Sequence, residues 1–163
     1  MAIPLWLAML PLNLITEICD IRRIEKELIA AIVSIESNGN SNATRYEPRF
    51  RWLYKPAEFA RRNYITEGTE RTHQRTSWGL MQVMGSVARE KFYNGPLNKL
   101  NDPRLGLSYG IDHLLGFIDK YDSLEDAISA YNQGGNYKKE DGTFKNQAYV
   151  DKIMKKYTYL KEL

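Results

Sequence analysis

The chain has 163 residues, 43% of them hydrophobic, which suits one globular domain with a proper core. Its formal net charge of +3 favours contact with an anionic polymer but is far too small for a nucleic-acid-binding protein. A single cysteine, Cys19, excludes an intramolecular disulfide, and with only His73 and His113 beside it no metal site is expected. No nucleotide or flavin motif is present either, so we expect no cofactor and no nucleic-acid partner.

The first fifteen residues are strongly apolar. They contain two prolines, have no basic residue before the apolar stretch and are too short to cross a bilayer. We therefore predict an apolar N-terminal arm over residues 1–20 that packs on a folded domain over residues 21–163, with no stable membrane span. An uncleaved export signal and a contact with a membrane surface are the alternatives for this segment.

Residues 21–35 form an apolar run that predicts a helix. Ile24, Leu28, Ile32 and Ile35 recur at helical spacing, and a polar turn begins at residue 37. Glu36 follows this run and shares the buried face with Ile32. Because burial disfavours the charged form, such a carboxyl group has a raised pKa and can act as a general acid.

The rest of the chain predicts a mainly α fold, a compact helical domain with a substrate groove and at most a small β-ribbon. Residues 42–54 are expected to be a loop or a short ribbon, and residues 63–76 a polar surface loop. Helices are predicted over residues 56–62, 80–92, 103–118, 124–132 and 149–157.

Four short motifs follow one another along the chain. They are residues 35–37 (Ile-Glu-Ser), 77–82 (Ser-Trp-Gly-Leu-Met-Gln), 130–132 (Ala-Tyr-Asn) and 149–153 (Tyr-Val-Asp-Lys-Ile). Over residues 21–157 the set resembles the catalytic domain of soluble lytic transglycosylases, relatives of goose-type lysozyme in the lysozyme superfamily. Two positions depart from the family pattern, since Gly39 replaces an aromatic residue and Arg45 replaces a serine. Residues 45–48 (Arg-Tyr-Glu-Pro) resemble phage-associated members instead, which points to a phage or prophage source.

The resemblance implies a peptidoglycan-degrading enzyme. Such an enzyme cleaves the β-1,4 bond between N-acetylmuramic acid and N-acetylglucosamine without water and leaves 1,6-anhydromuramic ends. Glu36 matches the catalytic acid of the family, which later acts as the base. The implied domain is a lysozyme-like transglycosylase domain over residues 21–163, with glycan strands as its partner.

The same motifs supply the candidate substrate-binding residues, four of which have a structural alternative. The candidates are Ser37, Met81, Gln82, Tyr131, Asn132 and Tyr149. For Met81 the alternative is core packing, which carries equal weight, and for Tyr149 it is a buried ring. For Tyr131 the alternative is a buried tyrosine whose hydroxyl bonds to the backbone, and for Asn132 it is a helix cap. For Gln82 we favour contact with a ligand.

Glu47 is the candidate second carboxylate. A hydrolytic, goose-type-lysozyme-like muramidase that inverts would use such a group as a base, at about 6.5–9.5 Å from the acid. An ion pair with a neighbouring arginine, Arg45, Arg49 or Arg51, is the reading that we favour. A third alternative is a non-catalytic glycan-binding or virion structural module.

The expected site of action is the bacterial cell wall or periplasm. Because the N-terminus offers no persuasive export signal, we expect delivery by a phage particle, by phage lysis proteins or by a secretion apparatus.

Overall fold

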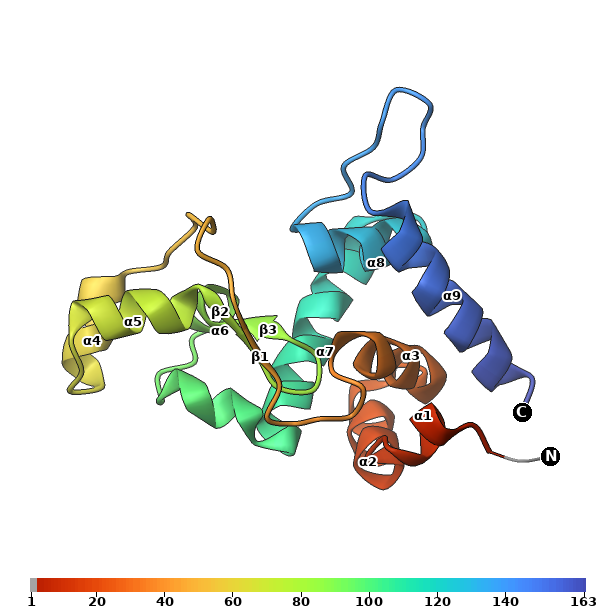
Figure 1. Ribbon diagram of the computed structural model, residues 1–163, viewed down its shortest axis with the longest axis horizontal. Coiled ribbons are helices and arrows are strands. Elements are labelled where there is room, and N and C mark those ends of the chain that lie inside the picture. Colours follow the sequence, from red (N-terminus) through yellow and green to blue (C-terminus); the bar gives the residue numbers. More distant parts are fainter. Residues whose placement is uncertain (1–2) are drawn as a thin grey trace.

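The computed structural model describes residues 3–163 (Figure 1). Over this range it has nine α-helices, a 3₁₀-helix (η1) and one three-stranded antiparallel sheet in the order β1-β2-β3, which confirms the mainly α prediction. The elements are α1 (Leu5–Ala8), α2 (Leu12–Arg22), α3 (Lys26–Glu36), β1 (Thr44–Tyr46), α4 (Pro56–Arg62), α5 (Glu67–Gln74), β2 (Thr76–Trp78), β3 (Val83–Met84), α6 (Gly85–Glu90), η1 (Leu97–Asn101), α7 (Pro103–Lys120), α8 (Leu124–Gln133) and α9 (Gln147–Lys161).

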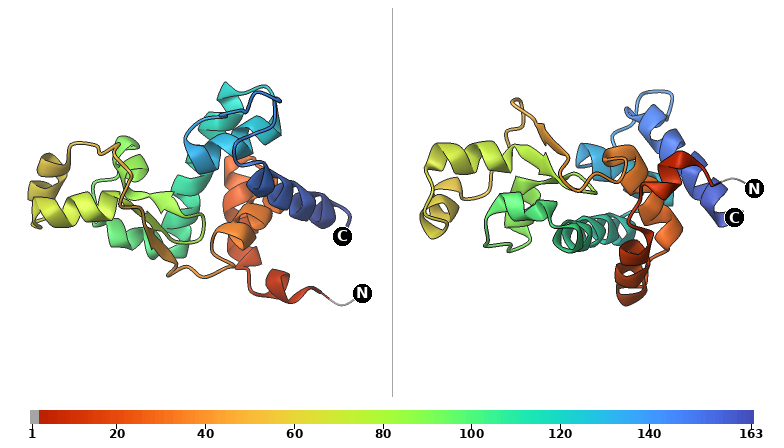
Figure 2. Two further views of the ribbon diagram at one scale, coloured as in Figure 1. Left: turned by 45° about the horizontal axis from the view of Figure 1, so that its top comes forward. Right: turned by 60° about the horizontal axis from the view of Figure 1, so that its bottom comes forward.

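Two groups of elements lie on either side of α7 (Figures 1 and 2). The sheet lies with α4, α5 and α6 on one side, and α1, α2, α3, α8 and α9 lie on the other. Helix α3 is the centre of the second group, packed against α2 and α9, and every residue from Leu28 to Ser34 is buried. Its last residue, Glu36, is only partly buried and lines a cleft.

The start of the first predicted helix is wrong. Residues 21 and 22 end α2, Arg23 takes a left-handed conformation with φ 57°, and α3 begins only at Lys26. Most of the predicted arm is helical, and Ile15, Ile18 and Cys19 of α2 are buried in the common core. The arm packs on the domain as a structural part of it; residues 1–2 lie outside the described range.

The predicted surface loop over residues 63–76 is wrong in its second half, which forms α5. Thr66 caps the start of this helix, because its side chain accepts a hydrogen bond from the backbone N–H of Thr69. An apolar stripe, the usual sign of a packed helix, is absent here because α5 buries two polar residues, Glu70 and Gln74.

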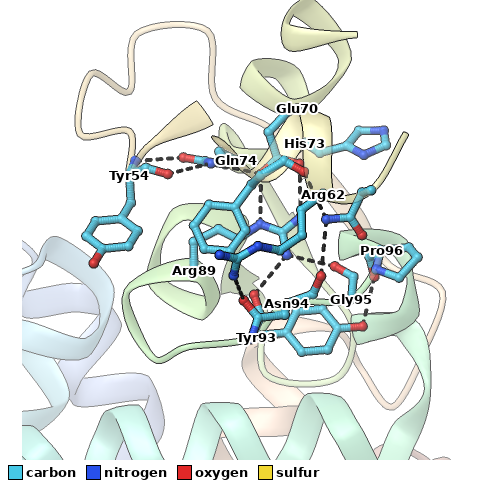
Figure 3. A network of polar contacts seen from close by, with 12 residues as sticks. Tyr54, Arg62, Glu70, His73, Gln74, Arg89, Tyr93, Asn94, Gly95 and Pro96 are labelled. Atoms are coloured by element: carbon cyan, nitrogen blue, oxygen red, sulfur yellow. Dashed lines mark hydrogen bonds and ion pairs between the residues drawn. The ribbon is translucent and has the colours of Figure 1, made fainter. Parts of the chain in front are cut away.

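The polar network around Glu70 explains how this face is buried (Figure 3). The guanidinium of Arg89 on α6 donates from Nε and Nη2 to the two carboxylate oxygens of Glu70, at 2.7 and 2.9 Å. Its Nη1 donates to the carbonyls of Tyr93 and Gly95 at 2.9 and 2.7 Å, and the guanidinium also lies 4.5 Å over the Phe59 ring. Such a pair is tolerated in the interior only when its hydrogen bonds are satisfied, as they are here.

The helix predicted over residues 80–92 is also wrong over its first half. Residues 76–78 and 83–84 are paired strands, and only residues 85–90 are helical, as α6. The tight turn between the strands holds Gly79 at φ 74° and Gln82 at φ 50°, which an α-helix cannot accommodate. Residues 80 and 81 are apolar because the turn itself is buried, and their spacing from later apolar residues only coincides with a helical period.

The other predicted helices are confirmed, with their caps. Asp102 accepts a hydrogen bond from the N–H of Leu105 at the start of α7, and Ser123 accepts one from the N–H of Asp126 at the start of α8. Helix α8 ends at Gly134 in the left-handed conformation. Within residues 3–163 no helix is both long and apolar enough to cross a membrane.

The buried ion pair gives the first prediction. We expect Glu70→Gln to lower the free energy of unfolding by about 3 kcal/mol, because it leaves the Arg89 charge buried without its counter-charge. Glu67→Gln on the same helix is the matched control, since Glu67 pairs with Arg71 at the surface and should change stability by less than about 1 kcal/mol. Urea unfolding of both variants measures the difference, and equal stabilities would contradict the role given to Glu70.

Candidate active site

A cleft of about 640 Å³ lies between the two groups of elements. Its lining comes from α3, β1, the segment between β1 and α4, β2, the following turn, β3, α6, α7 and α8. The lining residues are Glu36, Arg45, Glu47, Phe50, Trp52, Ser77, Gln82, Met84, Ser86, Val87, Glu90, His113, Phe117, Tyr131, Asn132, Gln133 and Gly134.

Glu36 is held at the cleft by the abrupt end of α3. The chain leaves the helix through Asn38 and Gly39, which have φ values of 51° and 80°. A Cβ atom on Gly39 would lie 2.3 Å from the carbonyl oxygen of Met9, so the N-terminal segment occupies the space that a side chain would need. This contact explains why glycine stands where the family pattern has an aromatic residue.

The environment of Glu36 favours its protonated form. Burial raises the pKa of this carboxyl group, and the raising effect exceeds two opposing ones, a hydrogen bond from Tyr149 and the positive charge of Arg45. The Tyr149 hydroxyl on α9 donates to Oε1 of Glu36 at 2.5 Å. Glu36 can therefore donate a proton, and both neighbours can stabilise the carboxylate that remains.

Tyr131 of α8 lines the same cleft as Glu36. Its hydroxyl donates to the carbonyl of Met81 at 2.7 Å, which is the backbone-satisfied alternative for this residue. Burial and the nearby Glu36 raise the pKa of both Tyr131 and Tyr149 well above the usual value for a phenol. Both hydroxyl groups therefore remain protonated and act as donors near the carboxyl group.

Three candidate binding residues lie outside the cleft lining, and one of them, Tyr149, reaches the site through its hydrogen bond to Glu36. The other two are Ser37 and Met81. Ser37 donates its hydroxyl to the carbonyl of Leu80 at 2.8 Å, which ties the end of α3 to the β2–β3 turn. Met81 has no exposed surface and packs closely against Gly110 of α7, the core position that the sequence left as its alternative. Neither side chain is presented to a ligand in the cleft.

Gln82 and Asn132 do line the cleft. The amide of Gln82 donates to the carbonyls of Ala43 and Gly79, both at 2.9 Å, and accepts from the Ser77 hydroxyl at 2.9 Å. These bonds brace the β2–β3 turn against the segment before β1. Asn132 is exposed at the end of α8, and its Oδ1 accepts from Asn146 at 3.0 Å.

Glu47 also lines the cleft, and its carboxylate is engaged. Nε of Arg45 lies 2.5 Å from Oε1 of Glu47, so the ion pair favoured by the sequence is present. The Glu47 backbone N–H donates to the carbonyl of Arg75 at 2.8 Å and fixes the start of the following segment. One oxygen of the Glu47 carboxylate is therefore already engaged by a guanidinium at the cleft.

The sequence did not reveal the part of the cleft that α6 and α7 form. His113 and Phe117 of α7 line this part, with their ring centroids 4.8 Å apart, and α6 adds Val87 and Glu90. Burial, with a smaller effect from Lys91, lowers the pKa of His113 to about 4, so this imidazole is neutral at neutral pH and is no proton donor like Glu36. Their four-residue spacing puts His113 and Phe117 on one helical face, but only the tertiary structure turns that face toward the cleft.

The titratable groups of the cleft do not form a metal-binding cluster. Across residues 3–163, no three His, Cys, Asp or Glu side chains gather in a way that could hold a metal ion.

A mainly α domain with a small sheet and a cleft that holds a buried carboxyl group has the architecture of a lysozyme-like domain. The family model for the transglycosylase SLT domain matches residues 13–153, and the chain belongs to this family. The assignment supports peptidoglycan as the substrate and an action at the cell wall. No curated protein and no solved structure gives a significant match.

The hydrogen bond to Glu36 gives the second prediction. We expect Tyr149→Phe to raise the pKa of Glu36 further, because the lost hydroxyl stabilises the carboxylate form. Titration of the Glu36 side-chain carboxyl carbon by NMR measures the shift. Tyr157→Phe is the control, since Tyr157 lies on the same helix and donates to Glu25 instead. An unchanged or lowered Glu36 pKa in Tyr149→Phe would argue against this account of the site.

Proposed function

We propose that this protein cleaves the β-1,4 bond between N-acetylmuramic acid and N-acetylglucosamine by lytic transglycosylation. The observation that carries the proposal is Glu36, a carboxyl group at the end of a buried helix that lines the cleft and has a raised pKa. The family assignment supports the substrate class. The single-carboxylate mechanism suits this site, because Glu36 faces the cleft while Glu47 is paired with Arg45.

In the first step Glu36 donates its proton to the glycosidic oxygen. The bond between C1 of the muramic sugar and that oxygen breaks, and the N-acetylglucosamine side leaves with a hydroxyl group. C1 becomes an oxocarbenium-like centre, and Glu36 becomes a carboxylate. The Tyr149 hydroxyl and the Arg45 charge stabilise this carboxylate.

In the second step the carboxylate of Glu36 accepts the proton of the muramic C6 hydroxyl. The C6 oxygen forms a bond to C1 and closes the 1,6-anhydro ring. Glu36 returns to its protonated form, and no water is consumed. Because the substrate supplies its own nucleophile, the step needs no second carboxylate.

The hydrolytic alternative would use Glu47 as the base that activates water. Its ion pair with Arg45 argues against that role, because the guanidinium already engages a carboxylate oxygen that would have to accept a proton from water. A non-catalytic glycan-binding or virion module would have no need for a carboxyl group of raised pKa in its cleft.

Delivery to the wall is a separate part of the proposal. We propose a phage particle, phage lysis proteins or a secretion apparatus as the route. A lysis assay with protein added from outside or expressed inside the cell would distinguish self-delivery from a need for such a partner.

The third prediction concerns Glu36 itself. Glu36→Gln should reduce the release of soluble fragments from purified peptidoglycan by about a thousandfold, because glutamine cannot donate the proton. It should not lower the melting temperature at neutral pH. Since the folded-state pKa of Glu36 is raised, its stabilising contribution is present below the pKa of the unfolded chain and is lost as the pH rises through the folded value. Full activity of Glu36→Gln would remove Glu36 as the acid.

The fourth prediction concerns the products and Glu47. Mass analysis of the released fragments should find 1,6-anhydromuramic ends, lighter by one water than reducing ends. Glu47→Gln should keep this product and lie within about fivefold of the wild-type rate, because it removes only a partly exposed ion pair. Reducing ends, together with a loss in Glu47→Gln as large as in Glu36→Gln, would favour the hydrolase.

A further inference from the structure

Trp52 is an exposed aromatic side chain that lines the cleft. It is 77% exposed, whereas the buried aromatic Trp78 has only 7% of its surface accessible. Tyr64 and Phe92 are comparably exposed, at 96% and 78%, but neither belongs to the cleft lining. Scattered exposed aromatic residues are common, so the location of Trp52, and not its exposure alone, needs an explanation.

The segment that carries Trp52 is anchored at both ends. At its start the N–H of Glu47 donates to the carbonyl of Arg75, and Nε of Arg75 donates to the carbonyl of Phe50 at 3.1 Å. At its end the Tyr54 backbone N–H and carbonyl both bond to the Gln74 side-chain amide, at 2.7 and 2.9 Å (Figure 3).

These anchors connect the exposed segment to the buried network. Gln74 also donates to Glu70 at 2.8 Å, and Glu70 holds the buried Arg89. The backbone around residue 52 is therefore fixed by the interior of α5 rather than by packing of the Trp52 ring. An apolar ring held in water on an anchored backbone is preorganised for a ligand, because the ordering of the segment precedes binding.

The chemistry of the cleft indicates the class of ligand. The indole presents a flat apolar face, which suits the C–H face of a pyranose ring. Phe50 is a second aromatic residue of the cleft lining on the same segment, and Asn132 and Gln133 supply amides to the lining from α8. Together these groups can hold a sugar that has both an apolar face and hydrogen-bonding hydroxyl and acetamido groups.

We propose that Trp52, with Phe50, forms a carbohydrate-stacking subsite for an N-acetylhexosamine ring of the bound glycan strand. This deepens the proposed function and rests on it for the identity of the glycan. Trp52 acts in binding and not in proton transfer, so its loss weakens binding of the glycan without removing the chemistry at Glu36.

The test uses the full chain with Glu36→Gln, so that the probe is not cleaved, and a soluble hexamer of β-1,4-linked N-acetylglucosamine. The chain has three tryptophans, Trp6, Trp52 and Trp78, and Trp52 dominates the exposed indole surface. Binding of the hexamer should shift tryptophan emission to the blue and protect it from acrylamide. Trp52→Phe should abolish most of this signal change while retaining binding by calorimetry.

Trp52→Ala should weaken binding of the hexamer on the order of tenfold by calorimetry. The matched controls are Tyr64→Ala and Phe92→Ala, which remove equally exposed rings outside the cleft and should bind as the parent does. If the melting temperatures of these variants equal that of the parent, a loss of affinity in Trp52→Ala comes from the missing contact with the hexamer and not from unfolding. Parent-like binding by Trp52→Ala, no emission change on binding, or no binding by the parent would each overturn the subsite.

The same variant in the active background separates this proposal from the proposed function. If the wild-type chain releases no fragments from peptidoglycan but the Trp52-dependent binding is found, the transglycosylase proposal fails and the carbohydrate subsite stands. If fragments are released and Trp52→Ala leaves both KM and binding unchanged, the subsite fails and the function stands. An increase in KM with little change in kcat supports both.

Discussion

The hydrogen bond between Tyr149 and Glu36 is the interaction on which the site depends. It joins the buried helix near the start of the domain to the helix that closes it, and residues 113 positions apart meet at one carboxyl group. Burial alone would favour the neutral form of this group, whereas the proposed mechanism needs it in both protonation states. The hydrogen bond from Tyr149 and the charge of Arg45 partly offset the rise in the Glu36 pKa that burial causes. Glu36 can therefore both donate a proton and accept one.

The side of the cleft that carries the sheet depends on a different interaction. The buried residues of α5 are the polar Glu70 and Gln74, and the satisfied ion pair between Glu70 and Arg89 joins this helix to α6. From this interior, Gln74 and Arg75 extend hydrogen bonds to the segment over residues 47–54. A polar core therefore positions the aromatic rim of the cleft, which links the stability of this region to the binding of substrate.

The departures from the family pattern acquire physical reasons in this arrangement. Gly39 lies against the backbone of Met9, so the N-terminal segment compensates for the missing aromatic side chain. Arg45 engages the carboxylate of Glu47 and acts on the Glu36 charge at the same time. The Arg45 replacement thus ties the Glu47 carboxylate into an ion pair, while the Glu36 carboxyl group keeps its raised pKa.

The sequence alone determined the mainly α class, the capped starts of the helices at residues 103 and 124, and the place of Glu36 at the end of an apolar run, because periodicity and caps are local signals. Only the tertiary structure decided that residues 67–74 form a helix, since its packed face is polar and its partner, Arg89, comes later in the chain. It also turned residues 76–84 into a hairpin through positive φ values and put Met81 in the core. His113 and Phe117 of α7 and Trp52 of the segment between β1 and α4 line the cleft for the same reason: these two parts of the chain are distant in sequence, and no local pattern encodes their meeting.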